Sequence, residues 1–215
     1  MDPDAKQDLL GVGTRGAGDL TGPHLPVRRP ADNPFASKRI ENLRFRFRYT
    51  DLPALLKTCR LMDWRGAIVG AKGSGKTTLL ETLAAAVADR ARLVRLPADS
   101  RNPMALINEQ LAAPLVDGDI VFLDSAGQLG RLQWWWVSKR WRRVVITAHR
   151  RGRLPTLTEC RTDLALLDEL VAELAPDDID QLRPELPGLF ASEGGDLRRC
   201  FRRLYDLYSP RTRSG

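Results

Sequence analysis

The residues Gly70-Ala71-Lys72-Gly73-Ser74-Gly75-Lys76-Thr77 decide how this chain of 215 residues is interpreted. They fit the spacing G-x-x-x-x-G-K-[ST] at every fixed position, a match expected by chance in on the order of one chain in a hundred of this length. Glycines let successive backbone N–H groups point into one concave cradle, and the N-terminus of a following helix adds about half a positive charge. The stretch therefore predicts a phosphate-binding loop.

The residues on either side of this loop supply the context that such a loop requires. The apolar run Ala67–Val69 predicts a strand before it, and residues 76–90 predict a helix after it. The apolar face of that helix consists of Leu79, Leu80, Leu83, Ala84 and Val87. Lys76 is expected to reach the β- and γ-phosphates of a nucleotide, and the Thr77 hydroxyl to bind magnesium. The expected phosphate-binding residues are Gly70, Lys72, Gly73, Ser74, Gly75, Lys76, Thr77 and Thr78.

From residue 65 onward, apolar strands alternate with helical stretches. Further strands are predicted at Leu93–Leu96, Ile120–Leu123 and Val144–Ile146, and further helices near 104–111 and 129–141. Continuous apolar strands separated by helices indicate an α/β fold, a parallel sheet flanked by helices. After about Pro176 the strand signal stops, and short helical pieces continue to Tyr208.

A second motif is the buried strand Asp119–Leu123, which ends at Asp124. A carboxylate at the end of a buried strand is common by itself, and it can simply cap the next helix. Together with the phosphate-binding loop, it predicts that Asp124 holds magnesium, through water. Thr77 and Asp124 are thus the expected metal-binding residues.

With these two motifs the sequence resembles the P-loop NTPases of the additional-strand class, which includes the AAA+ ATPases. One extra strand-helix unit, at Leu93–Leu96, separates the loop helix from the Asp124 strand, and Val144–Ile146 follows. In that class a later strand inserts between two earlier ones and ends in a polar sensor residue. The resemblance implies that Thr147 is this sensor, with His149 beside it; the alternative is an ordinary polar strand end.

The resemblance departs from the family pattern at Ser125, where members of the class usually carry the glutamate that activates water. A serine hydroxyl is not a base near neutral pH. Gln128 is a candidate to position water, by analogy with the glutamine of GTPases, and Glu109 and His149 are further candidates. We therefore expect ATP and Mg²⁺ to bind and hydrolysis to be slow or completed by a partner.

The turn Gly194-Gly195-Asp196-Leu197-Arg198 resembles the turn that opens the lid helix of AAA+ proteins. In that family the arginine leans over the γ-phosphate, which implies this role for Arg198. The alternative is that Asp196 caps the helix and Arg198 is a surface charge. The candidate catalytic residues are Lys76, Asp124, Gln128, Thr147 and Arg198.

These signals predict a division of the chain. It comprises a disordered tail at 1–33, a strand/helix extension at 34–64, a P-loop nucleotide-binding domain at 65–175, a small helical lid at 176–209 and a tail at 210–215.

Within the extension, Phe35 of the Asn-Pro-Phe tripeptide is expected to anchor the chain. Leu43–Tyr49 alternates apolar and basic residues, which predicts an edge strand with its arginines in water. One of its aromatic rings is a candidate for packing on a nucleotide base. Asp51 is expected to cap a helix reaching about Met62.

Residues 131–153 hold eight Lys or Arg and neither Asp nor Glu, interleaved with Trp134, Trp135, Trp136 and Trp141. This composition suits phosphate neutralisation and base stacking. It equally suits a protein partner, a homo-oligomer interface with arginines that reach a neighbouring nucleotide, or a solvated basic face.

The composition restricts the remaining choices. The net charge is +7, and no apolar stretch approaches the roughly 18 residues of a membrane span. With three widely spaced cysteines, reduced buried thiols are expected. We expect a cytoplasmic protein without a membrane partner.

The absence of an Asn-Lys-x-Asp signature favours ATP over GTP. The expected function is a slow ATPase coupled to a partner; a small-molecule kinase and a non-hydrolysing nucleic-acid-binding module are the alternatives.

Overall fold

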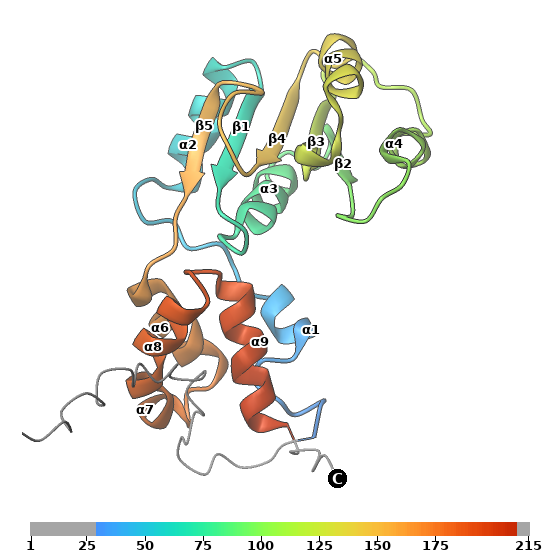
Figure 1. Ribbon diagram of the computed structural model, residues 1–215. Coiled ribbons are helices and arrows are strands. Elements are labelled where there is room, and N and C mark those ends of the chain that lie inside the picture. The colour runs from blue at the N-terminus through green and yellow to red at the C-terminus, as the bar shows by residue number, and fades with distance from the viewer. Residues whose placement is uncertain (1–28, 210–215) are drawn as a thin grey trace, which may run out of the picture.

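The computed structural model describes residues 29–209, so the tail expected at 210–215 and residues 1–28 of the tail expected at 1–33 lie outside the described residues. Figure 1 shows a sheet body above and a helical body below. The strands are β1 (Arg65–Gly70), β2 (Ala91–Arg95), β3 (Ile120–Asp124), β4 (Val144–Ala148) and β5 (Thr156–Cys160). The helices are α1 (Ser37–Glu41), α2 (Leu52–Leu61), α3 (Lys76–Ala85), α4 (Pro103–Gln110), α5 (Arg131–Arg140), α6 (Leu164–Leu174), α7 (Ile179–Leu182), α8 (Leu186–Ser192) and α9 (Leu197–Tyr208), with the 3₁₀ turns η1 (Ala126–Gln128) and η2 (Arg183–Glu185).

The sheet has five strands in the order β2-β3-β4-β1-β5, and all its pairs are parallel. The fold class predicted from the sequence is confirmed, and β4 lies between β3 and β1. β5 has no counterpart among the predicted strands. Its sequence, Thr-Leu-Thr-Glu-Cys, is not an apolar run because an edge strand is only half buried. Of the four predicted strands, β1, β3 and β4 are the buried inner ones, whereas β2 is the other edge strand and buries only Val94.

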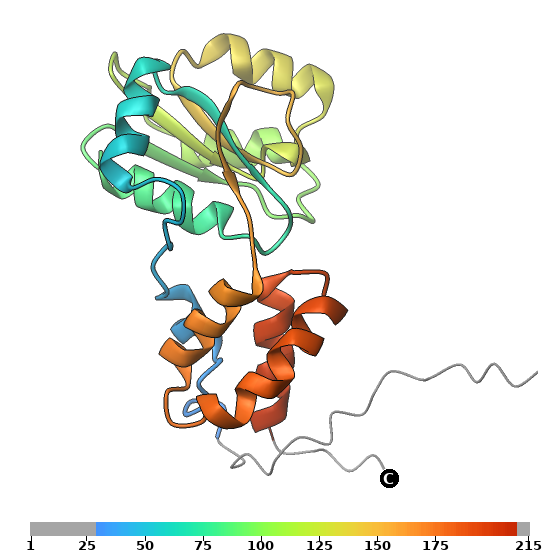
Figure 2. The ribbon, with the colours of Figure 1, turned by 90° about the vertical axis from the view of Figure 1, so that its left-hand side faces the viewer.

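Helices cover both faces of the sheet. Because successive strand residues point to opposite faces, Ile68 and Phe122 pack with α2 and α3, whereas Ala67 and Leu123 pack with α4 and α5. The predicted apolar face of α3 is buried as expected, and Asp51 caps α2 by accepting a hydrogen bond from the Ala54 N–H at 2.7 Å. Figure 2 shows the sheet edge-on between these helices.

The strand predicted at 43–49 is absent, because these residues form no ladder with the sheet. Phe45 and Phe47 pack against the α2–α3 side of the core, with ring centroids 5.0 Å apart. Arg46 and Arg48 are not free in water, since they form ion pairs with Glu169 and Glu173 of α6. Residues 43–49 thus form a segment between the two bodies, which we call the strap. Its aromatic side chains pack on the core and its arginines form ion pairs, which explains the period-two alternation.

The helical body combines the beginning and the end of the described chain. Phe35 is 1% exposed and packs on Phe201 and Tyr208 of α9, with ring centroids 6.2 and 5.8 Å away. The Asn33 side chain donates to the Tyr205 carbonyl at 3.0 Å, so residue 33 belongs to this core and not to a tail. The expectation that Phe35 anchors the chain is confirmed.

The core of the helical body also contains α6. Leu167 and Val171 are fully buried within it together with α8 and α9. The lid boundary expected at 176 therefore falls inside this core, and by packing the body starts near Leu164. The chain passes between the two bodies twice, through residues 42–51 and through 161–163 (Figure 1).

All three cysteines are buried free thiols, as expected. Burial raises the pKa of Cys59 and Cys200 to about 11 and that of Cys160 to about 12. Among residues 29–209, no helix is long and apolar enough to cross a membrane.

The packing of Phe35 yields a test of the helical core. Phe35→Ala removes a ring held between two aromatic partners, and we expect it to lower the free energy of unfolding by about 3–5 kcal/mol in urea denaturation. Tyr49→Ala is the matched control, because Tyr49 is 84% exposed and should change stability by no more than about 0.5 kcal/mol. Equal effects of the two substitutions would contradict the anchoring role.

Candidate functional site

The phosphate-binding loop runs from the end of β1 to the start of α3, at the edge of the sheet that faces the helical body (Figure 1). Gly73 and Gly75 have φ angles of 72° and 81°, which L side chains rarely adopt. At Gly70 the constraint is space, since a Cβ there would lie 2.5 Å from the Cys160 carbonyl oxygen and 2.6 Å from the Ser74 Oγ. Backbone curvature and close packing thus require glycine at these positions.

Lys76 opens α3 and is held inside the loop. Its side chain is only 8% exposed, and its Nζ donates to the Ala71 carbonyl oxygen at 2.6 Å. Burial lowers the pKa of this ammonium group; the neighbouring Cys160, Asp124 and Asp196 oppose the shift, and Arg198 adds to it. A buried cation with a neutral carbonyl as its acceptor favours an anion in the loop.

Two hydroxyl groups hold the carboxylate of Asp124. The Thr77 Oγ1 donates to one oxygen at 2.9 Å, and the Thr147 Oγ1 donates to the other at 2.5 Å. The Thr147 oxygen also accepts from the Ser125 N–H at 2.7 Å. The parallel strands cause this convergence, because β1, β3 and β4 are neighbours and their carboxyl ends share one edge.

The residues after Asp124 form a tight turn into α5. Ser125 has a φ of 61°, and the Gln128 N–H donates to its carbonyl oxygen at 2.9 Å in η1. Gln128 is half-buried on this turn, whereas His149 is exposed after β4 and Glu109 is exposed on α4. Among the residues that the structure describes, no side-chain hydrogen bond or ion pair joins Gln128, Glu109 or His149 to the phosphate-binding loop.

The helical body touches the loop through the start of α9. A Cβ on Gly73 would lie 1.9 Å from the Asp196 Oδ1, so this carboxylate packs directly on the loop. Asp196 also caps α9 by accepting from the Arg199 N–H at 3.2 Å, as expected for a helix start. The sequence singled out the Gly194-Gly195-Asp196 turn, but nothing in it indicated contact with Gly73.

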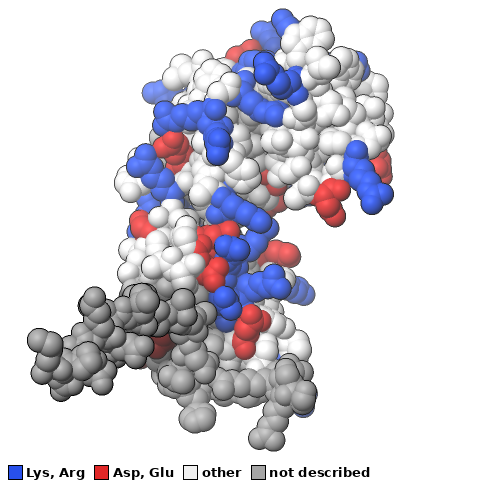
Figure 3. Space-filling model, in the orientation of Figure 1, with Lys and Arg blue, Asp and Glu red and all other residues white. Residues whose placement is uncertain are grey.

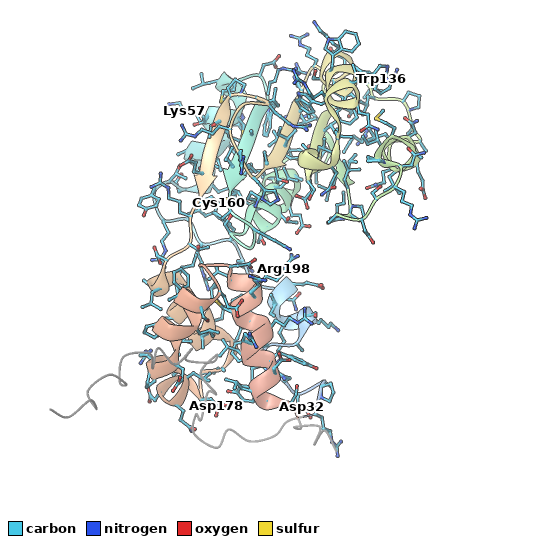
Figure 4. The ribbon with its side chains drawn as sticks, viewed as in Figure 1. Asp32, Lys57, Trp136, Cys160, Asp178 and Arg198 are labelled. Atoms are coloured by element: carbon cyan, nitrogen blue, oxygen red, sulfur yellow. The ribbon has the colours of Figure 1, made fainter. Side chains whose placement is uncertain are left out.

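Arg198 lies in the first turn of α9 at the end facing the sheet body, as Figure 4 shows. Its side chain is exposed, and its charge contributes to lowering the pKa of Lys76. Figure 3 shows that the surface is hollowed between the two bodies, with basic side chains along the hollow. The structure therefore brings Arg198 towards the loop without a direct contact.

The aromatic strap forms one wall beside the loop. The ring of Phe45 lies 3.5 Å from the position of a Cβ on Gly75. A pocket next to it is lined by Phe47, Tyr49, Leu79 and Thr158 among others. Phe45 and Phe47 also contribute to the core, so core packing and a base-binding role are compatible at this place.

The basic stretch at 131–153 is less uniform than its sequence suggests. Arg142 and Arg143 form ion pairs with Asp63, and Arg151 pairs with Glu159. Arg153 points inward, donating to the Leu129 carbonyl at 2.6 Å and lying 5.3 Å from the centre of the Trp134 ring. Acids from distant segments of the sequence, Asp63 and Glu159, therefore neutralise part of the charge of this stretch.

No family model matches the chain, and no curated protein matches it. Among solved structures it is similar to a lysine-to-arginine mutant of RuvB from Thermotoga maritima, with 16% sequence identity and a TM-score of 0.45. The match covers 71% of this chain and spans 58% of the length of the RuvB chain. This likeness carries no information on activity or partners.

The hydroxyl of Thr147 can be tested alone. Thr147→Val keeps the shape but leaves the Ser125 N–H and one Asp124 oxygen without their partner, so we expect a loss of about 1–3 kcal/mol of stability. Thr147→Ser retains the hydroxyl and should recover most of this loss. The measurement is urea denaturation of both variants, and a Thr147→Val protein as stable as the wild type would show that the hydroxyl does not organise the site.

Proposed function

We propose that the chain binds ATP with magnesium at the phosphate-binding loop and hydrolyses it slowly. The observation that carries this proposal is the Asp124 carboxylate, held between the loop hydroxyl of Thr77 and the strand-end hydroxyl of Thr147. A carboxylate fixed beside a phosphate cradle is the arrangement that positions a nucleotide-bound cation. Lys76 supplies the positive charge for the terminal phosphates.

The donor set fits magnesium. Residues 29–209 contain no cluster of three or more His, Cys, Asp or Glu side chains that suits a metal ion. Magnesium does not need one, because it is usually bound by one or two carboxylates together with substrate phosphates and water. Thr77 and Asp124 would hold it, and the ion would neutralise charge on the phosphate oxygens.

Slow hydrolysis follows from the side chains available to activate the attacking water molecule. Ser125 replaces the expected glutamate. Its backbone is in the left-handed conformation, and the turn η1 begins at the next residue. Gln128 on that turn orients water at most, since an amide accepts no proton. The proposed catalytic role of Gln128 is therefore to position water, not to act as a base.

We further propose that the helical body responds to the nucleotide. Asp196 packs on Gly73 and Arg198 faces the loop from the same turn, so phosphates in the loop would repel one side chain and attract the other. The bodies are joined by two chain segments and the Arg46 and Arg48 ion pairs. A nucleotide-dependent movement of α9 is the expected output to a partner.

The kinase alternative receives less support. A kinase would need arginines to bind the phosphates of its substrate, and the basic residues 150–153 are the candidates. Arg151 is paired with Glu159, however, and Arg153 donates a hydrogen bond to the Leu129 carbonyl. Those two guanidinium groups are therefore already engaged inside the protein.

Binding is tested by Lys76→Ala. Removal of the buried ammonium group should abolish ATP binding in the presence of Mg²⁺ in isothermal titration calorimetry, while the fold persists by circular dichroism. Lys57→Ala is the control, because Lys57 is exposed on α2 away from the loop (Figure 4). ATP affinity that is the same in wild type and Lys76→Ala would refute the proposal.

Turnover is tested by phosphate release. We expect a basal rate far below the ~10 s⁻¹ typical of enzymes, and a further decrease in Asp124→Asn, which removes the charge that holds the cation. A fast wild-type rate that disappears in Gln128→Ala or His149→Ala would show that the water-activating group has been misjudged.

A further inference from the structure

The outer face of α5 combines exposed apolar side chains with exposed cations. Leu132 is 83% exposed, Trp135 60% and Trp136 41%, whereas Val137 on the other side of the helix is buried. Arg131, Lys139 and Arg140 are exposed on the same helix. Residues four apart lie above one another on a helix, so these six residues form one continuous surface, the α5 face.

The cations of the α5 face lack the internal partners that its neighbours have. No acidic group lies within ion-pair distance of Arg131, Lys139 or Arg140 in the part of the chain that the structure describes. The neighbouring cations of the same basic stretch do have acidic partners, because Asp63 pairs with Arg142 and Arg143, and Glu159 pairs with Arg151. The positive charge of this face is therefore directed to solvent.

The start of α5 strengthens this positive charge. The first turn carries no acid, and Arg131 occupies the first helical position. A cation at the N-terminus opposes the helix dipole and disfavours folding. This position is stabilised when an anion lies over it.

The rings and the cations are interleaved. The Arg140 guanidinium lies 5.2 Å from the centre of the Trp136 ring and covers it in part, whereas Trp135 is more exposed. In Figure 4, Trp136 lies at the outer end of the sheet body, far from the helical body. Figure 3 shows Lys and Arg side chains beside uncharged ones at that end.

We propose that the α5 face binds single-stranded nucleic acid. Lys and Arg neutralise backbone phosphates, and exposed aromatic rings stack on unpaired bases without requiring a particular sequence. Protein interfaces are also enriched in tryptophan and arginine, but they are depleted in lysine, and their buried centre is depleted in charged residues. Here Arg131 lies before the two exposed rings, and Lys139 and Arg140 lie after them. From Arg131 to Lys139 the face extends about 12 Å along the helix, enough for a short run of nucleotides.

This surface is separate from the phosphate-binding loop, and the proposal does not depend on ATP. Lys76→Ala should therefore bind single strands as the wild type does. A failure of ATP binding and a failure of strand binding are thus distinguished by two different variants.

The experiment measures fluorescence anisotropy of labelled single strands of DNA and of RNA of about 20 nucleotides, longer than the ~4–16 that single-strand-binding folds cover. A duplex of the same length is the comparison. The wild type should bind single strands more tightly than duplex. Trp135→Ala should weaken binding by about 10-fold or more, and more than Trp136→Ala does, because the second ring is already covered by Arg140.

The charge arm uses two triple variants with the same change in net charge. The first variant is Arg131→Glu/Lys139→Glu/Arg140→Glu. It should reduce the slope of log K against log salt concentration by about 2, because each lost phosphate contact contributes about 0.7 to that slope for a single strand. Lys57→Glu/Arg60→Glu/Arg202→Glu changes exposed cations elsewhere and should retain the wild-type slope. Circular dichroism checks that every variant is folded.

Three results would overturn the proposal. One is the absence of strand binding by the wild type at low salt; another is an equal loss in the two triple variants. The third is self-association in analytical ultracentrifugation that disappears in Trp135→Ala/Trp136→Ala while strand binding is unchanged, which would assign the α5 face to a second copy of the chain.

Discussion

The hydrogen bonds that hold the Asp124 carboxylate connect three elements of the sheet body at the candidate site, the loop after β1 and the strands β3 and β4. Thr77 belongs to the loop after β1, Asp124 ends β3, and Thr147 lies on β4. The insertion of β4 between β1 and β3 makes this meeting possible, since the three strand ends are then adjacent. A half-buried carboxylate with two hydroxyl donors is satisfied without a metal ion, so the site is ordered before any ligand arrives.

The second contact that matters joins the two bodies. Asp196 lies where any side chain on Gly73 would collide with it, so the conformation of the loop and the position of α9 are coupled. On the opposite side, Arg46 and Arg48 fasten the strap to α6 through surface ion pairs, which are individually weak. The proposed movement of the helical body relative to the sheet would have to break only this close contact and a few weak ion pairs.

The sequence predicted the parts of the fold in which local chemistry and tertiary structure agree. The loop, the apolar strands β1, β3 and β4 and the caps at Asp51 and Asp196 fall in this class, because glycine geometry, continuous burial and capping are local properties. β5 was missed because an edge strand lacks the apolar run. The strap was misread because alternation also arises when aromatic rings pack inward and arginines pair with a distant helix. Likewise, no local signal showed that Asp63 would neutralise Arg142 and Arg143, or that Asp196 would contact Gly73.

The participation of Phe35 in the core of α9 has a consequence for synthesis on the ribosome. Residues 65–160 complete the sheet body early, and domains generally fold as units during translation. The helical body must wait, because Phe35 packs on Phe201 and Tyr208, which are among the last residues described. Until then Phe35 has none of its aromatic partners, and a chain interrupted before α9 would expose this apolar side chain next to a completed sheet body. The helical body can thus form only after α9 has been synthesised.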